Sequence, residues 1–195
     1  MRIIAGEFRG RILEPLFKEP GQRSDLHKTL RPTSDKVRGA MFNILEHGSW
    51  PHYPFHEKAR VLDGFCGSGA LGFEALSRGA SFALFLDDNA AALKLAKTNA
   101  ENLRAEKSCL FELRDLAQPQ RWKEAKFDLV FLDPPYRKNL AIPALKTLEE
   151  GGFIAPKAIA VIETAEDEEL AAPFGWQLHT RRSWSDTAAS FLTRE

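Results

Sequence analysis

The sequence feature that most constrains the fold is an alternation of short apolar strands with helices, which begins at Ala59. Parallel strands need a crossover connection, usually a helix, so this alternation predicts a mostly parallel sheet with helices on both faces. We therefore expect an α/β fold. The predicted strands are residues 60–65, 82–88, 108–115, 127–133 and 158–164, and the predicted helices are residues 69–80, 90–104 and 140–152.

The chain closes with two more predicted strands, residues 176–184 and 188–194, and no helix lies between them. Strands joined by so short a connection pair in antiparallel fashion. We therefore expect a C-terminal hairpin at the edge of the sheet.

The first 58 residues have a different character, and we assign them to an N-terminal extension, with residues 59–195 forming the main domain. Residues 1–16 alternate apolar and basic side chains and contain two glycines, which predicts a short hairpin. Residues 34–48 predict a helix with Ser34 or Thr33 as N-cap. One face of this helix is apolar and carries Val37, Met41, Ile44 and Leu45.

Composition excludes several classes of protein. The chain has 195 residues, 44% of them hydrophobic, which suits one domain with a full core, and its net charge is +0. Any basic surface for nucleic acid must therefore be local. Cys66 and Cys109 form no Cys/His cluster, so we expect no metal site, and two free thiols fit the cytoplasm. No segment is apolar for long enough to span a bilayer, and no membrane association is expected.

A glycine-rich loop, "VLDGFCGSGALG", follows the first strand of the main domain. Gly67, Gly69 and Gly72 match the GxGxxG pattern of a cofactor-binding loop that opens a helix. A sharp turn that lets a cofactor touch the backbone has no room for a Cβ atom. The pattern does not distinguish a nicotinamide cofactor from S-adenosylmethionine.

Aspartates at the ends of the first three strands help to distinguish these two cofactors. Asp63 precedes the glycine loop, where it would repel a pyrophosphate and attract a cationic ammonium group. Asp87 can accept hydrogen bonds from ribose hydroxyls, and the adjacent Asp88 points the other way. Asp115 can accept from an adenine amino group, with Leu116 packing on the ring; a plain loop aspartate is an equal alternative.

The fourth strand ends in "FDLVFLDPPY", residues 127–136. Asp133 and the Pro134 carbonyl are acceptors, which Pro134 and Pro135 hold in a rigid arrangement. Two fixed acceptors suit an exocyclic amino group, and Tyr136 offers a face on which a base can stack. In a parallel sheet this strand end lies beside the first, so Asp133 would adjoin the cofactor. We predict that Asp133, Pro134, Pro135 and Tyr136 form the catalytic site of a methyltransferase.

The order of "RIIAGEFRGR", "LRPTSDKVRGAMFNIL", the glycine loop, "FLDD" and "FDLVFLDPPY" resembles the RsmD family of bacterial methyltransferases. The resemblance implies a Rossmann-like class I methyltransferase fold with a seven-stranded sheet. It implies transfer of a methyl group from S-adenosylmethionine to the N2 amino group of guanine 966 in 16S ribosomal RNA. The implied partner is 16S rRNA or an assembling small ribosomal subunit, and we expect a monomer.

The family resemblance also implies roles for individual residues. The methionine end of the cofactor would lie at Asp63, Gly67 and Gly69, its ribose at Asp87 and its adenine at Asp115. Asp133 to Tyr136 would hold the target base. The segment that closes over the cofactor and faces RNA would contain Arg31, Thr33, Arg38 and Asn43. The loop departs from the family pattern at Gly64 and Cys66, and the linker from Lys18 to Lys28 is longer than expected.

Basic residues in the extension are the best candidates for RNA contact. Alternating arginines can face phosphates from one side of a hairpin, although a solvated edge strand explains them equally well. The predicted RNA-binding set is Arg2, Arg9, Arg11, Arg31 and Arg38.

Three other functions compete with the rRNA methyltransferase. An adenine-N6 methyltransferase acting on DNA or RNA would use the same DPPY segment, but 195 residues leave no room for a separate DNA-recognition domain. An NAD-dependent oxidoreductase would leave DPPY unexplained. A non-catalytic ribosome-assembly factor would have no need of Asp63, Asp87 and Asp133 together.

Overall fold

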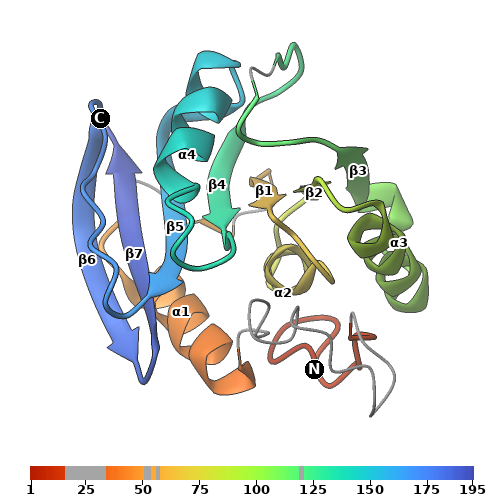
Figure 1. Ribbon diagram of the computed structural model, residues 1–195. Coiled ribbons are helices and arrows are strands. Elements are labelled where there is room, and N and C mark those ends of the chain that lie inside the picture. The colour runs from red at the N-terminus through yellow and green to blue at the C-terminus, as the bar shows by residue number, and fades with distance from the viewer. Residues whose placement is uncertain (16–33, 51–53, 56–57, 119–120) are drawn as a thin grey trace.

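A seven-stranded sheet forms the centre of the molecule (Figure 1), with strand order β3-β2-β1-β4-β5-β7-β6. The computed structural model describes residues 1–15, 34–50, 54–55, 58–118 and 121–195. The strands are β1 (Arg60–Gly64), β2 (Phe82–Asp87), β3 (Cys109–Leu113), β4 (Phe127–Leu132), β5 (Ile154–Ala165), β6 (Trp176–Trp184) and β7 (Thr187–Arg194). The helices are α1 (Asp35–His47), α2 (Ala70–Ser77), α3 (Ala90–Leu103) and α4 (Ala141–Glu150), with a 3-10 turn at Glu106–Ser108.

The first five strands are parallel, as the alternating pattern predicts. β1 lies between β2 and β4, and β5 continues the sheet beyond β4. The C-terminal hairpin lies at the edge, also as predicted, and β7 pairs antiparallel with β5 while β6 forms the outer strand. The order of these two strands did not follow from the sequence. β5 begins four residues before the predicted strand, because Ile154 pairs with Phe127 across a register shift.

Helices cover both faces of the sheet (Figure 1). One core cluster contains side chains of α1, α2 and α3 together with Val61 of β1; the other contains α4 together with Leu62. Neighbouring residues of a strand point to opposite faces, so β1 contributes to both clusters. Ile3 and Leu13 of the N-terminal extension belong to the first cluster.

The N-terminal residues form a compact turn rather than a regular hairpin. The predicted short hairpin is present only in minimal form: an antiparallel bridge joins Arg2 and Ile12, and the amides of Ile3 and Leu13 donate to the Arg11 and Met1 carbonyls. The turn packs on α2, where the Glu7 amide donates to the Ser77 carbonyl at 2.8 Å. A Cβ atom at Gly6 would lie 1.7 Å from that carbonyl oxygen, so the backbones approach too closely for any side chain. Close packing on α2 therefore fixes the shape of this turn.

Helix α1 begins at the predicted N-cap, because the Ser34 hydroxyl accepts a hydrogen bond from the Val37 amide. Its buried face differs in part from the predicted one. Val37 and Ile44 are only half-buried, at the margins of that face. The buried residues are Arg38, Met41, Phe42 and Leu45.

Several residues named in the sequence predictions lie outside the described part of the chain. They are Arg31, Thr33 and the linker from Lys18 to Lys28.

Candidate active site

The carboxyl ends of β1, β2 and β4 meet at one edge of the sheet, and the predicted site residues of these strands lie there. The Gly67 amide donates to Asp87 Oδ2 at 2.9 Å, which joins the glycine loop to the end of β2. The Asp133 amide lies 3.4 Å from the Gly64 carbonyl oxygen, which joins the end of β4 to the same loop. The tertiary structure thus brings together residues that are 70 positions apart in sequence, from Asp63 to Asp133.

The three glycines of the loop have different roles. Gly67 and Gly69 have φ angles of 54° and 81°, in the region that glycine adopts without strain. A Cβ atom at Gly69 would lie 2.5 Å from the Phe73 ring, and one at Gly72 would lie 2.4 Å from the Phe85 ring. A Cβ atom at Gly67 would have no described neighbour within 4 Å. Gly69 and Gly72 therefore permit close packing of α2 on β2, whereas Gly67 leaves open space beside the loop.

Asp63, at the end of β1, is buried under this loop. Its Oδ2 atom accepts a hydrogen bond from the Gly72 amide at 2.8 Å. Burial raises the pKa of Asp63 to about 8, more than the hydrogen bond lowers it, and the nearby Asp87 adds to the rise. A buried carboxylate of this kind is stabilised by a cation.

Asp87 faces the glycine loop and Asp88 is exposed, as predicted for adjacent strand residues. Asp87 Oδ1 also accepts from the Asn89 amide at 2.9 Å. Burial raises the pKa of Asp87, while the two backbone hydrogen bonds act in the opposite direction. Both carboxylate oxygens therefore accept hydrogen bonds from backbone amides, and Asp87 fixes the shape of the loop.

Asp115 and Leu116 follow β3 in the positions expected, but they differ in exposure. Asp115 is exposed and its Oδ1 accepts from the Ala117 amide at 2.8 Å, which makes a local turn. Leu116 is almost fully buried; a Cβ atom at Gly64 would lie 2.9 Å from its Cδ1 atom. The expectation that Leu116 packs on an adenine ring is not supported, because its side chain packs in the core beneath β1.

The DPPY segment leaves β4 beside the glycine loop. Pro134 is buried, and Asp133, Pro135 and Tyr136 are half-buried. The Tyr136 hydroxyl donates to Glu163 at 2.6 Å and lies 2.8 Å from the Thr187 hydroxyl. Glu163 and Thr187 were not predicted to be site residues, because nothing in the sequence relates the ends of β5 and β7 to Tyr136.

A cavity of about 320 Å³ lies on the β5 side of the DPPY segment. Most of its lining is apolar, and carboxylates of Glu163, Glu168 and Glu169 stand among these residues. Its apolar lining includes Pro134, Pro135, Tyr136, Leu140, Ile142 and Leu170. A cavity of this volume and lining can hold a planar aromatic ring.

Asn99 of α3 is a further residue that sequence reasoning missed. Its side chain is buried and makes a pair of hydrogen bonds with the Glu14 backbone. The same amide group donates to the Ser68 carbonyl of the glycine loop at 3.0 Å. Asn99 therefore connects the N-terminal extension to the loop.

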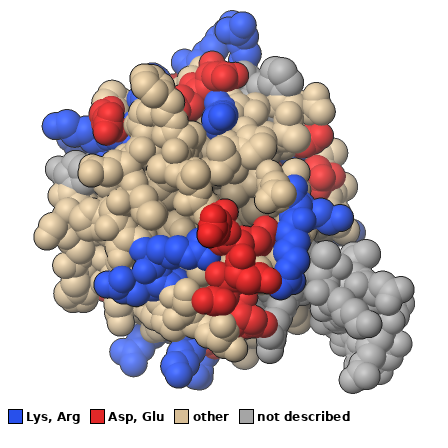
Figure 2. Space-filling view, turned by 60° about the vertical axis from the view of Figure 1, so that its left-hand side comes forward, with Lys and Arg blue, Asp and Glu red and all other residues tan. Residues whose placement is uncertain are grey.

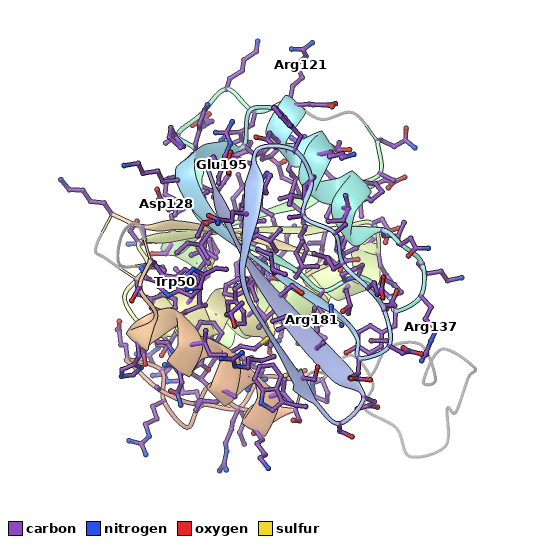
Figure 3. The ribbon with its side chains drawn as sticks, turned by 90° about the vertical axis from the view of Figure 1, so that its left-hand side faces the viewer. Trp50, Arg121, Asp128, Arg137, Arg181 and Glu195 are labelled. Atoms are coloured by element: carbon purple, nitrogen blue, oxygen red, sulfur yellow. The ribbon has the colours of Figure 1, made fainter. Side chains whose placement is uncertain are left out.

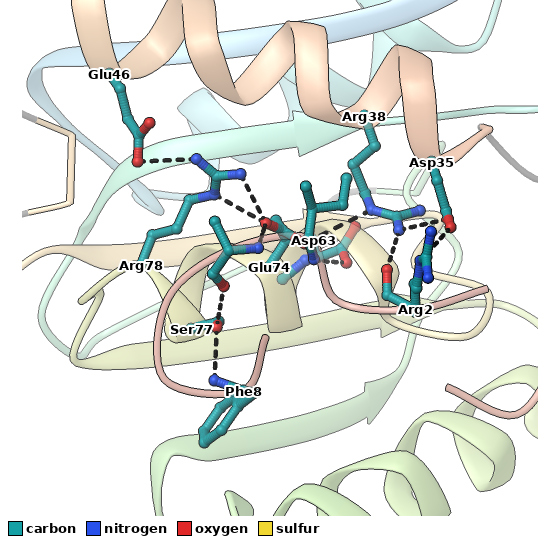
Figure 4. A network of polar contacts seen from close by, with 12 residues as sticks. Arg2, Phe8, Asp35, Arg38, Glu46, Asp63, Glu74, Ser77 and Arg78 are labelled. Carbon is teal, nitrogen blue, oxygen red and sulfur yellow. Dashed lines mark hydrogen bonds and ion pairs between the residues drawn. The ribbon is translucent and has the colours of Figure 1, made fainter. Parts of the chain in front are cut away.

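The predicted RNA-binding arginines fall into two groups. Arg2 and Arg9 are exposed, and the exposed Arg11 donates to the Asn102 and Leu103 carbonyls at the end of α3. Arg38 is completely buried, donates to Asp35 and to the Arg2 carbonyl, and lies 3.8 Å from Glu74 (Figure 4). The prediction that Arg38 contacts RNA was wrong, because the guanidinium group binds other parts of the protein.

Glu74 of α2 is the centre of this buried network (Figure 4). Its carboxylate accepts hydrogen bonds from the Ile4 and Ala5 amides and forms an ion pair with Arg78 at 2.8 Å. Arg78 in turn pairs with Glu46 of α1. The N-terminal turn, α1 and α2 are thus joined through one carboxylate.

The surface charges near the C-terminal hairpin are mixed. In the described part of the face in Figure 2, an acidic patch near the centre separates two basic groups, so that these form no continuous basic surface. Arg137 lies at the rim of the molecule and pairs with Asp167 at 3.0 Å, and Arg181 of β6 donates to the Ala165, Glu166 and Glu168 carbonyls (Figure 3). Arg181 therefore holds the turn after β5.

Two further features concern only the residues that the structure describes. None of their helices is long and apolar enough to cross a membrane. No group of three or more His, Cys, Asp or Glu side chains among them is arranged to hold a metal ion.

Comparison with known proteins identifies the family of this chain. Residues 1–193 match the family described as "Conserved hypothetical protein 95". "Ribosomal RNA small subunit methyltransferase D" of Haemophilus influenzae is 39% identical over 183 residues, which are 91% of this chain and 86% of the relative. The Escherichia coli K12 protein of the same name is 36% identical over 201 residues, 100% of this chain and 90% of that protein.

Solved structures agree with this assignment. The "putative methyltransferase yhhF" of Escherichia coli superposes with a TM-score of 0.78 at 32% identity, over 100% of this chain and 98% of that one. An RNA methyltransferase of Salinibacter ruber in complex with S-adenosylhomocysteine has a TM-score of 0.61 at 16% identity, over 84% of this chain and 94% of that one, and shares the class I fold. The chain therefore belongs to the RsmD family of S-adenosylmethionine-dependent class I methyltransferases.

Proposed function

We propose that this protein transfers a methyl group from S-adenosylmethionine to the exocyclic N2 amino group of a guanine in 16S ribosomal RNA, at position 966 of the usual numbering. The observation that carries the proposal is the meeting of Asp63, Gly67 and Asp87 with the DPPY segment at one edge of the sheet. The relatives named small subunit methyltransferase D, at 36% and 39% identity over nearly the whole chain, support the rRNA substrate.

The residues around the glycine loop suit S-adenosylmethionine. Gly67 borders open space, so a ligand can reach the loop backbone there. The buried Asp63 favours a cation, and the amino acid part of the cofactor carries an ammonium group. The exposed Asp115, after β3, is the proposed contact for the adenine, and Asp87, at the end of β2, is the proposed contact for the ribose. When bound, the cofactor supplies an electrophilic methyl group.

The DPPY segment prepares the target amine. A guanine amino group is a poor nucleophile while its lone pair is delocalised into the ring. Asp133 and the Pro134 carbonyl accept hydrogen bonds from its two N–H groups, which draws the nitrogen towards tetrahedral geometry and frees the lone pair. The main contribution of the protein is to hold the amine in line with the methyl group.

The base must leave its stack before it can reach Asp133. The cavity beside Pro135 and Tyr136 is the proposed place for its ring. Arg2, Arg9 and Arg11 are the proposed phosphate contacts, since these three side chains are exposed. We propose that the enzyme acts as a monomer in the cytoplasm, on 16S rRNA or an assembling small subunit.

A methyl-transfer assay tests this function. Purified protein and labelled S-adenosylmethionine are mixed with unmodified small ribosomal subunits, naked 16S rRNA or duplex DNA, and the labelled nucleoside is identified by mass spectrometry. We expect N2-methylguanosine at one site of 16S rRNA. Asp133→Ala should lower kcat by about 100-fold or more while the cofactor still binds. Methyladenosine in place of methylguanosine would keep the mechanism and overturn the proposed substrate.

A further inference from the structure

Three separate parts of the fold meet at the hydroxyl group of Tyr136. The hydroxyl donates to Glu163 Oε1 of β5 at 2.6 Å and lies 2.8 Å from Oγ1 of Thr187, the first residue of β7. Glu163 is 2% exposed and Thr187 is 9% exposed, so water has little access to either group. A buried contact between three side chains restricts the phenol far more than an exposed one.

The direction of each hydrogen bond follows from the charges. Burial and the adjacent Glu163 carboxylate raise the pKa of Tyr136, so the phenol keeps its proton. A carboxylate only accepts, and the single phenol proton therefore goes to Glu163. The Thr187 hydroxyl must then donate to the phenol oxygen. The phenol thus donates one hydrogen bond, to Glu163, and accepts one, from Thr187. The Tyr136 ring is therefore held by side chains of two strands.

The register of the sheet places these two partners. In the antiparallel β5–β7 pair, Glu163 lies opposite Ala189 and Thr187 lies opposite Ala165. Residues two apart on a strand share a face, so Glu163 and Thr187 are diagonal neighbours on one face. A shift of one residue in this pairing would turn one of the two side chains away from Tyr136.

We propose that Glu163 and Thr187 are positioning residues for methyl transfer, because they fix the Tyr136 ring that lines the target-base cavity. The proposal rests on the proposed function in one respect, namely that the target base enters the cavity beside the DPPY segment. Neither residue is placed against the cofactor loop. Loss of the Glu163 or Thr187 side-chain contact should therefore weaken binding of the RNA substrate and slow methyl transfer, and leave cofactor binding unchanged.

Near-isosteric variants can separate this role from a purely structural one. Tyr136→Phe keeps the ring and removes both hydrogen bonds, Thr187→Val removes one donor, and Glu163→Gln keeps an acceptor without the charge. The measurements are kcat and KM for small subunits, the cofactor Kd and the melting temperature. Thr193→Val, on the same strand but paired with Ile159 and Gln177, is the matched control.

We expect Tyr136→Phe and Thr187→Val to lower kcat/KM by about 10-fold each, the effect of one or two lost hydrogen bonds. Glu163→Gln should retain more activity than Tyr136→Phe, and Thr193→Val should match the wild type. In the Tyr136→Phe background, Thr187→Val should cause no further loss, because its partner is already gone. The cofactor Kd should stay within about 2-fold of the wild-type value in every variant.

Two results would overturn the proposal. One is wild-type kcat and KM in both Tyr136→Phe and Thr187→Val. The other is losses that multiply in the double variant, since residues acting through Tyr136 cannot lose its contacts twice. Total label transferred tests the positioning role, and the identity of the methylated nucleoside tests the guanine assignment, so the two proposals can fail separately.

Discussion

At the scale of single residues, burial decides the chemistry of the carboxylates. Asp63 and Asp87 stand 24 positions apart at neighbouring strand ends, and both have a raised pKa because burial disfavours the charged form. Asp115, at the next strand end, is exposed. The sequence presents these three as equivalent aspartates after apolar strands, and only the depth of each side chain separates them.

Asp63 should make the stability of the protein depend on pH. Its pKa is about 8 in the folded protein and near 3.8 when unfolded, so between these values the folded state holds a proton that the unfolded state has lost. The free energy of unfolding should therefore fall as pH rises from about 4 to 8. Asp63→Asn removes this contribution, because the amide has no proton to lose.

Urea unfolding of the wild type and Asp63→Asn at pH 5 and pH 8 measures the effect. We expect the variant to gain stability relative to the wild type at the higher pH, by on the order of a few kcal/mol. An equal difference between the two proteins at both pH values would show that Asp63 does not titrate in this range.

At the scale of elements, the unit formed by β1, the glycine loop and α2 is tightly packed at one position of the loop and open at another. Gly69 lies against the Phe73 ring, whereas Gly67 borders open space. Glycine is therefore required at position 69 for close packing, whereas at position 67 it leaves space beside the loop. Substitution of each should separate the stability of this unit from its capacity to hold a ligand.

Gly69→Ala should destabilise the fold by about 2–3 kcal/mol, since strain at a positive φ adds to a clash with Phe73. Gly67→Ala should cost only about 1 kcal/mol, from the positive φ alone. Its cofactor affinity should nevertheless fall by about 10-fold or more, because the new methyl group occupies the open space beside the loop. Thermal unfolding and calorimetric titration with S-adenosylmethionine measure the two effects. Unchanged affinity in Gly67→Ala would mean that the ligand does not approach this position.

At the scale of the whole molecule, buried polar groups attach the N-terminal extension to α2, α3 and the glycine loop of the main domain. Glu74 binds the Ile4 and Ala5 amides, and Asn99 joins Glu14 to Ser68 of the glycine loop. Ile3 and Leu13 share a core cluster with α2 and α3. The extension and the glycine loop therefore form a continuous packed unit.

Glu74→Gln tests this attachment. The substitution leaves the buried Arg38 and Arg78 without their shared carboxylate, so we expect a loss of about 3–5 kcal/mol in the free energy of unfolding. The Ile4 and Ala5 amides should exchange with solvent faster than in the wild type. Glu46→Gln removes the more exposed partner of Arg78 and should cost about 1 kcal/mol or less. Equal losses in both variants would show that Glu74 is not the centre of the network.

Local patterns in the chain account for most of the elements and for part of the site. The alternation of strands and helices, the glycine loop and the DPPY segment follow from periodicity and turn chemistry within short windows. The predicted strand ends at Asp63, Asp87 and Asp133 meet because parallel strands share one carboxyl edge. Such features depend on neighbours in sequence or on a general rule of sheets.

Other features depend on contacts between distant segments, and no local pattern contains them. Arg38 is basic on an otherwise apolar helix face, and its buried guanidinium group finds partners both nearby, at Asp35, and far along the chain, at the Arg2 carbonyl and Glu74. The pairing of β7 with β5 brings Thr187 to Tyr136, which lies 51 positions earlier. Local sequence specifies the conformation that a segment adopts. The partner of a buried polar group is decided by the tertiary structure, because a polar group that loses its water on folding is stable only where another segment supplies a hydrogen bond or an opposite charge.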